Sequence, residues 1–277
     1  MTRYFVNPFS PPLPVRRPVR GTVFFLHIPK TAGTSVLEAM ARFYRPDAVF
    51  PYHGEEALVQ HDPQYVRRRY RLVAAHAGFR IANVVGDHIV TVLRDPVDRI
   101  LSLYNYWHAA PEQKLVSRFT QKIDPAVVMA KNLDFATFLD CRLRRVRADL
   151  DNAQAWQVAH SNFGAARDEI GPIDDAELYS RAAKALASMD VIGTTDDLAR
   201  FGAGIERSLG LPVRIGRANV TARKSTARDR LAPEVIAKID RLTSVDRALY
   251  EDIRAGRIRP SPRRLRARWR RLGPMIG

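Results

Sequence analysis

The chain has 277 residues, of which 46% are apolar or aromatic and 27% are charged. This is enough apolar material for one sizeable core, and it argues against several large domains. No run of about 18 apolar residues occurs, and the first 20 residues lack the apolar stretch of a secretory signal. The one cysteine, Cys141, excludes an internal disulfide and a cysteine-based zinc site. We therefore expect a soluble, cytoplasmic protein.

The net charge of +16 is concentrated at the two ends of the chain. Residues 1–20 hold four arginines, residues 253–277 hold nine, neither segment has an acidic residue, and the rest of the chain carries only +3. Such ends suit an anionic partner, namely phospholipid head groups, nucleic acid or an acidic glycan. The alternative is solvated tails whose arginine content reflects genome composition. Nucleic acid is disfavoured because no aromatic series or helix-turn-helix pattern accompanies the charge.

We divide the chain into a Pro- and Arg-rich lead-in (1–20), one folded domain (21–255) and an Arg-rich tail (256–277). In the tail, Trp269 lies among arginines and near apolar residues, which suits a basic amphipathic segment at the surface of an anionic membrane. The alternative is a disordered tail. Under the first interpretation, the cytoplasmic protein would also contact the inner face of a membrane peripherally.

Apolar, β-rich runs alternate with segments of helical periodicity along the chain. Strands are expected at 22–28, 71–75, 88–93 and 190–193. Helices are expected at 34–43, around 100–107, at 135–139, 151–160, 175–189 and 197–209, and from Pro233 and Ser244. Strands that are apolar throughout, separated by helices, predict a parallel α/β sheet covered on both faces. Ligands of such sheets bind at the carboxyl ends of the strands. The residues after Ile28, Ala75 and Leu93 are therefore the candidates for a site.

The segment HIPKTAGTS, from His27 to Ser35, follows the first expected strand. A loop of small residues that opens onto a helix N-terminus, with Lys30 beside it, can hold a phosphate. It is not a Walker A loop, because the lysine precedes Gly33 instead of following the last glycine. A kinase that uses a nucleoside triphosphate is therefore disfavoured. The structural alternative is an ordinary βα turn in which Thr34 caps the helix.

The segment RDPVDRILSLYNYW follows the third expected strand. Arg94 stands at the strand end, and Ser102 lies about two helical turns further on. An arginine fork and a hydroxyl suit a second phosphate. The alternative is that Arg94 pairs with Asp95 or Asp98 and that Arg99 faces water. Because the two segments follow neighbouring strands, we expect a ligand with two separate phosphate groups.

Together, HIPKTAGTS and RDPVDRILSLY resemble the 5′- and 3′-phosphate motifs of sulfotransferases that use 3′-phosphoadenosine 5′-phosphosulfate (PAPS). The likeness is greatest to the carbohydrate branch that contains heparan sulfate 2-O-sulfotransferase, and it extends from about Thr22 to Arg254. Weaker matches lie at 76–79, at Asn152 and Gln154 near the acceptor site, at 191–198, and at 223–226 with 231–233. The resemblance implies a P-loop-like three-layer α/β fold. It also implies transfer of a sulfuryl group to a hydroxyl of a carbohydrate or glycolipid acceptor.

The resemblance also implies roles for individual residues. Lys30 would contact the bridging oxygen of the donor, Arg94 and Ser102 would bind the 3′-phosphate, and His76 would be the general base. The 5′-phosphosulfate would be held by Pro29, Lys30, Thr31, Ala32, Gly33, Thr34 and Ser35. The loop over the nucleotide would be Arg223, Lys224, Ser225 and Thr226. Heparan 2-O-sulfotransferases have a second histidine two residues before the base, where this chain has Ala74, so the acceptor stays open.

This chemistry agrees with the residues present. In-line transfer builds negative charge on the departing phosphate, which a lysine stabilises, and the attacking hydroxyl needs a base. Among the histidines, only His76 follows a strand at the expected ligand edge, whereas we expect His27 to be buried and hydrogen-bonded. Asp95 or Glu55 are alternative bases. No metal is expected, because the sequence has no cluster of carboxylates or histidines that would hold one.

Two other functions remain open. The first is a P-loop kinase-like phosphotransferase that uses ATP and magnesium, which the missing Walker A lysine disfavours. The second is a non-catalytic protein that binds anions or lipids on a sulfotransferase scaffold, which the presence of Lys30, His76 and Ser102 disfavours. For a sulfotransferase, a sugar, a lipid head group, a small alcohol and a tyrosine hydroxyl all remain candidate acceptors.

Overall fold

The computed structural model describes residues 12–14, 19–51, 58, 60–110, 124–160, 167, 170–216 and 226–260. Three predicted donor-binding residues, Arg223, Lys224 and Ser225, lie outside this part of the chain. So do the alternative base Glu55 and the tryptophan of the arginine-rich tail, Trp269.

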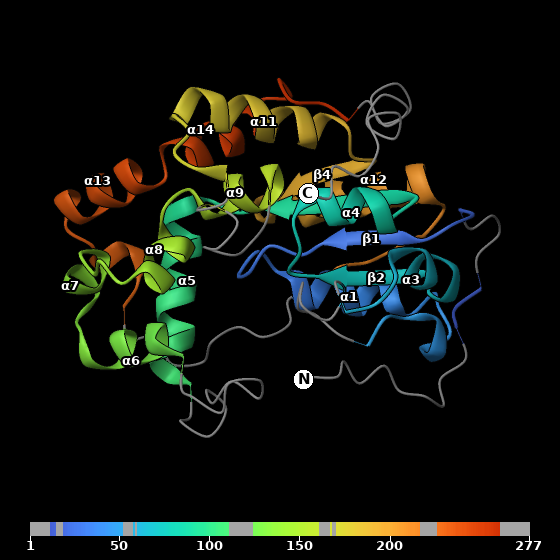
Figure 1. Ribbon diagram of the computed structural model, residues 1–277, viewed down its shortest axis with the longest axis horizontal. Coiled ribbons are helices and arrows are strands. Elements are labelled where there is room, and N and C mark those ends of the chain that lie inside the picture. Colours follow the sequence, from blue (N-terminus) through green and yellow to red (C-terminus); the bar gives the residue numbers. More distant parts are fainter. Residues whose placement is uncertain are drawn as a thin grey trace.

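A four-stranded parallel sheet forms the middle layer of the fold, as predicted (Figure 1). Its strands are β1 (Val23–Leu26), β2 (Leu72–Ala75), β3 (His88–Leu93) and β4 (Val191–Thr194). The order across the sheet is β2-β1-β3-β4, so β1 lies between β2 and β3 and pairs in parallel with both. Every residue of β1 and β2 is buried, which explains why these strands read as continuous apolar runs instead of alternating ones.

Successive residues of each strand pack into opposite layers. On one face, Phe24, Val73 and Ile89 pack against four helices. These are α4 (Phe79–Val85), α9 (Ala153–Ala159), α11 (Asp175–Ala187) and α14 (Ser244–Arg254). On the other face, Phe25 and Val90 pack against α1 (Gly33–Ala41) and α12 (Leu198–Leu209). The predicted three-layer α/β architecture is therefore confirmed.

A third apolar cluster lies beyond the carboxyl ends of the strands (Figure 1). It is built around α5 (Pro96–Ala109), which is separated from the end of β3 by two residues. The helices packed with it are α6 (Pro125–Asn132), α7 (Phe135–Leu139), α8 (Arg144–Leu150) and α13 (Pro233–Leu242). This cluster holds α5 in place beside the edge of the sheet where a ligand is expected.

Some short elements were not predicted. The helix α3 (Pro63–Arg69) and the 3-10 turns η1 (Pro46–Ala48), η3 (Thr195–Asp197) and η4 (Arg228–Arg230) are absent from the expected elements. The start of α3 has a readable signal, because the Asp62 carboxylate accepts a hydrogen bond from the Gln64 backbone N–H at 2.9 Å and a proline follows directly. Within the described residues, no helix is both long and apolar enough to cross a bilayer.

Candidate functional site

The loop that follows β1 has an unusual backbone. Lys30 and Ala32 have positive φ values of 71° and 60°, although neither is glycine. Such residues are uncommon and cost about 1–3 kcal/mol each, and left-handed residues in a short loop turn backbone N–H groups toward one side. Thr31, which is fully buried, holds the loop by donating its hydroxyl to the Ile28 carbonyl at 2.9 Å. A loop of this geometry in front of the N-terminus of α1 is of the kind that holds anions in other proteins.

The residue that caps α1 is Ala32, which offers no side-chain hydrogen bond. The structural alternative for this loop, a turn in which Thr34 caps the helix, is therefore wrong. Thr34 lies inside the helix, which begins at Gly33. Because Ala32 has no side chain that could cap the helix, the start of α1 is a place where an anion could accept from backbone N–H groups.

Gly33 is required by a neighbouring side chain. A Cβ atom at this position would lie 1.7 Å from Nε2 of His27. The His27 ring stacks on Phe25 with 5.4 Å between ring centroids and is 7% exposed, so the expectation that His27 is buried is confirmed. The first turn of α1 can approach the sheet only because Gly33 has no side chain.

Gly33→Ala should therefore destabilise the protein by about 1–3 kcal/mol, because a methyl group cannot share the space of the His27 ring. Thermal unfolding would measure the effect, and a titration with adenosine 3′,5′-bisphosphate would measure the distortion of the loop. Gly216→Ala is the matched control, because a Cβ there would meet nothing within 4 Å. Equal melting temperatures for the two variants would contradict this interpretation.

Lys30 projects from the loop toward α5. Its Nζ lies 4.0 Å from the ring centroid of Tyr106, an exposed residue of that helix. Desolvation by burial, and then the positive charge of Arg94, lower the pKa of Lys30 to about 8. No carboxylate among the described residues forms an ion pair with this ammonium group. The lysine is thus charged at neutral pH, by a small margin.

Arg94 follows β3 directly and reaches the same loop. Its Nη1 donates a hydrogen bond to the Lys30 carbonyl at 3.1 Å. Its own backbone is held by the fully buried Gln154, which accepts from the Arg94 N–H and donates to the Arg94 carbonyl, both at 2.9 Å. Burial lowers the pKa of the Arg94 guanidinium, although nearby carboxylates oppose the shift.

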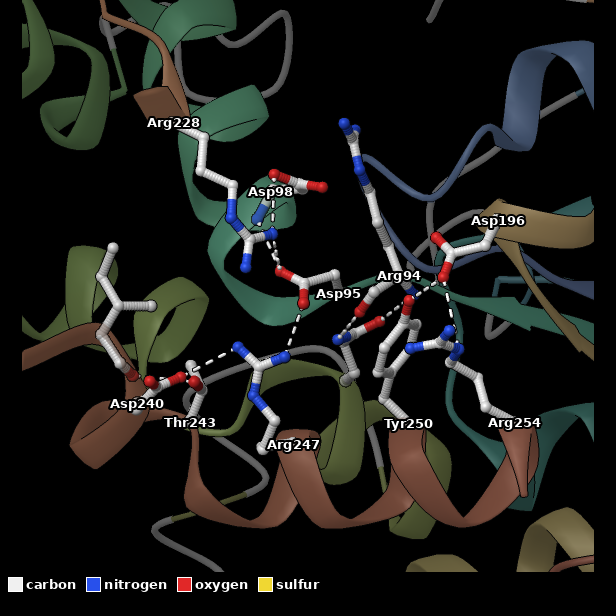
Figure 2. A network of polar contacts seen from close by, with 12 residues as sticks. Arg94, Asp95, Asp98, Asp196, Arg228, Asp240, Thr243, Arg247, Tyr250 and Arg254 are labelled. Atoms are coloured by element: carbon white, nitrogen blue, oxygen red, sulfur yellow. Dashed lines mark hydrogen bonds and ion pairs between the residues drawn. The ribbon is translucent and has the colours of Figure 1, made fainter. Parts of the chain in front are cut away.

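The structure contradicts the alternative for Arg94, in which this residue pairs with Asp95 or Asp98. Asp95 caps α5, and its carboxylate forms ion pairs with Arg228 at 3.0 Å and with Arg247 at 2.5 Å (Figure 2). Burial raises the pKa of Asp95, but the hydrogen bonds and charges around it lower the value overall. Each carboxylate oxygen of Asp95 already accepts a hydrogen bond from an arginine, which disfavours Asp95 as the group that takes a proton from an acceptor.

Arg99 is also not where the alternative placed it. Instead of facing water it is completely buried, and it donates to the backbone carbonyl of Asp149. Its guanidinium is electrostatically coupled to the buried carboxylate of Asp246. The second arginine of the RDPVDR segment is therefore a structural residue, and the first is the one that reaches the loop after β1.

Ser102 lies on the face of α5 that is turned toward Lys30. It is one helical turn before Tyr106, and residues four apart share a helix face. The same helix also fixes Thr226, because Asn105 donates to the Thr226 carbonyl at 2.9 Å and accepts from its N–H at 3.2 Å. Asn105 is 3% exposed. Ser102 and Thr226, which sequence reasoning placed at the donor site, are thus attached to one helix.

His76 follows β2, the strand next to β1. Its ring lies 4.4 Å from that of His27, centroid to centroid. Burial, and then the charge of Lys30, lower the pKa of His76 to about 4. The imidazole is therefore neutral at physiological pH and able to accept a proton. The sequence prediction that His76 lies at the ligand edge beside the lysine loop agrees with this position.

Two buried glutamines of α9 connect the strand ends. Gln154 holds Arg94 after β3, as described above. Gln157 donates to the carbonyls of His27 at 2.9 Å and Ala77 at 3.3 Å, which joins the segments after β1 and β2. Sequence reasoning missed Gln157. Its signal was present, because a second glutamine three residues after Gln154 lies on the same face of an otherwise apolar helix.

Asn152 has a structural role instead of lying open to an acceptor. It adopts a left-handed conformation, and its side-chain oxygen accepts from the backbone N–H groups of Val245 and Asp246 at the start of α14. The fully buried Asp246 in turn accepts from the N–H groups of Gln154 and Ala155. Each helix thus caps the other, and the pair positions the glutamine that holds Arg94.

A second polar cluster lies at the end of β4 (Figure 2). The Tyr250 hydroxyl of α14 donates to Asp196, whose carboxylate lies 3.6 Å from Nε of Arg254. Asp196 is one of the charges that raise the pKa of Arg94. Among the described residues, no three side chains of types that ligate metals are gathered together.

These features place a strained loop, Lys30 and Arg94 at the carboxyl edge of a parallel sheet, the edge at which ligands of such sheets bind. A model described as the Sulfotransferase family matches residues 19–250. Because the match covers most of the 277 residues, the chain belongs to this family and is a sulfotransferase. A search of curated proteins finds no match.

Proposed function

We propose that this sulfotransferase moves a sulfuryl group from PAPS to a hydroxyl of a carbohydrate or glycolipid. One observation carries the proposal: Lys30 and Arg94 come from neighbouring strand ends and are joined by a hydrogen bond from Arg94 to the Lys30 carbonyl. Neither forms an ion pair with a carboxylate of the described residues. The charge of Arg94 disfavours the ammonium of Lys30, so an anionic ligand bound between the two would stabilise the charged lysine.

The donor has two anionic groups that fit this arrangement. The strained loop from Pro29 to Ser35 and the start of α1 would hold the 5′-phosphosulfate, with Lys30 at the bridging oxygen. Arg94 and Ser102 would bind the 3′-phosphate, and the segment Arg223–Thr226 would lie over the nucleotide. The attachment of Thr226 to α5 supports the last assignment, because it brings the end of this segment to the helix that carries Ser102.

In the proposed reaction, the acceptor oxygen attacks sulfur while the bond from sulfur to the bridging oxygen breaks. His76 takes the proton of the attacking hydroxyl, and Lys30 stabilises the negative charge that develops on the departing adenosine 3′,5′-bisphosphate. The neutral state of His76 and the positive state of Lys30 at pH 7 support these roles.

The proposed acceptor class rests on the sequence. A carbohydrate or glycolipid is inferred from the likeness of the two motifs to the carbohydrate branch, and Ala74 separates the chain from heparan 2-O-sulfotransferases. The proposed contact of the tail with an anionic membrane rests on the sequence alone, because residues 261–277 lie outside the described part. A non-catalytic anion-binding protein would share the loop, whereas a P-loop kinase would need a Walker A lysine that this loop lacks, and the binding experiment that follows distinguishes the three functions.

Arg94→Ala should weaken adenosine 3′,5′-bisphosphate about 10- to 100-fold, because a charge-assisted bond to the 3′-phosphate is lost. Adenosine 5′-phosphosulfate, which has no 3′-phosphate, should bind nearly as before. Isothermal titration calorimetry of both ligands checks this, with the exposed Arg42→Ala as control. Equal weakening of the two ligands would contradict the 3′-phosphate assignment. Preference of the wild type for ATP with magnesium would indicate a kinase, and binding of no nucleotide a non-catalytic protein.

A further inference from the structure

Tyr106 makes a contact that its role in the fold does not require. The residue is 52% exposed, so its ring contributes little to the core beneath α5. Yet the Nζ of Lys30 lies over the face of this ring, 4.0 Å from its centroid. The contact joins the anion-binding loop to the helix face that carries Ser102, one turn earlier.

The other groups around the Lys30 ammonium do not favour its charge. The guanidinium of Arg94, at the end of β3, repels it, and the imidazole of His76, at the end of β2, is coupled to it and is neutral. No carboxylate of the described residues pairs with it. The face of an aromatic ring carries partial negative charge and attracts an ammonium group. Tyr106 therefore supplies favourable electrostatics where the neighbouring groups supply none.

We propose that Tyr106 is a positioning residue that keeps Lys30 charged and directed toward the Ser102 face of α5 before the donor binds. The inference rests on the proposed function, because it takes PAPS to be the anion that the charged Lys30 binds. Once the phosphates are bound they stabilise the ammonium themselves, so the ring matters most in the donor-free protein. Without the ring, burial and the charge of Arg94 would act on the ammonium unopposed, so its pKa would fall and more of the molecules would carry an uncharged amine.

The first test measures the charge of Lys30 without any donor. The protein is labelled with ¹³Cε-lysine, and the Lys30 resonance, one of seven, is assigned with Lys30→Arg and followed against pH. Tyr106→Leu should lower the Lys30 pKa by about 0.5 to 1.5 units, whereas Tyr106→Phe, which keeps the ring face, should stay within about 0.3 units. Tyr65→Leu, at a similarly exposed tyrosine on α3, is the control and should leave it unchanged.

An unchanged Lys30 pKa in Tyr106→Leu would overturn the inference, and so would an equal shift in Tyr106→Phe. Because Tyr106 is half exposed, the variants are expected to fold, and circular dichroism melting curves verify this.

The second test uses the pH dependence of sulfuryl transfer. The kcat/KM for PAPS reports groups of the donor-free enzyme, so in Tyr106→Leu its alkaline limb should move to lower pH. A shift of one unit would reduce kcat/KM about five-fold at pH 8 and hardly at all at pH 6.5. A loss that is the same at both pH values would contradict the role. If Tyr106→Leu lowers the Lys30 pKa but the wild type transfers no sulfuryl group, the role of Tyr106 toward Lys30 is supported and the proposed function is wrong.

Discussion

Lys30→Ala should lower kcat about 100- to 1000-fold, the effect of removing one preorganised group that stabilises the charge of a transition state. The ammonium is the cation that reaches from the loop toward the proposed bridging oxygen, and no other lysine belongs to the described site. The fold should survive, because alanine keeps the Cβ and thus adds no strain at a φ of 71°. The side chain also makes no ion pair with a described carboxylate that would be broken.

Transfer of labelled sulfate from PAPS at saturating donor measures the effect, with melting temperatures measured in parallel. Lys184→Ala, an exposed lysine on α11, is the matched control and should retain full activity. Lys30→Arg should recover part of the rate, because it restores a charge with a different shape. A loss smaller than about 10-fold in Lys30→Ala would remove Lys30 from the role at the leaving group.

The same residue sets an expected pH limit. Lys30 is protonated below its pKa of about 8 and loses its charge above it. The kcat/KM for PAPS reports the ionisation of groups in the donor-free enzyme. It should therefore be constant well below this pH and decline as the pH rises through it.

The strands and the two phosphate motifs were predictable because their signals are local. A strand that is buried on both faces must be apolar at every position, as β1 and β2 are, and polar residues that follow it at the carboxyl edge are candidate ligand groups. The adjacency of Lys30, His76 and Arg94 then follows from the strand order, in which β1 lies between β2 and β3. Parallel pairing alone brings their loops to one edge.

The parts that sequence reasoning missed depend on contacts between distant segments. The two glutamines of α9 can be picked out from the sequence, but their partners cannot, because Gln154 lies 60 residues from Arg94 and Gln157 lies 130 residues from His27. The backbone strain at Lys30 is also hidden, because lysine has no preference for a left-handed conformation. The loop glycine was expected to serve phosphate binding, whereas the structure shows that the His27 ring requires it.

His76→Ala should lower kcat about 100- to 10,000-fold, the usual contribution of a general base, while the affinity for adenosine 3′,5′-bisphosphate stays nearly unchanged. We expect kcat to fall without a change in bisphosphate affinity because His76 lies after β2 and would contact the acceptor hydroxyl. The donor phosphates would lie on the loop after β1 and on α5. Steady-state kinetics and calorimetry together measure it. His108→Ala, an exposed histidine of α5, is the control and should behave like wild type.

The pH profile separates His76 from other bases. With its pKa lowered to about 4, His76 in the donor-free enzyme is already deprotonated throughout the neutral range. On its acid side, the kcat/KM of wild type should therefore remain flat from about pH 7 to 5.5 and fall only when the imidazole takes up a proton at lower pH. An acid limb near the ordinary histidine pKa of about 6.5 would assign the proton transfer to a histidine in a solvated environment. In His76→Ala, a loss of affinity for adenosine 3′,5′-bisphosphate as large as the loss of kcat would show that His76 binds the donor instead of acting as the base.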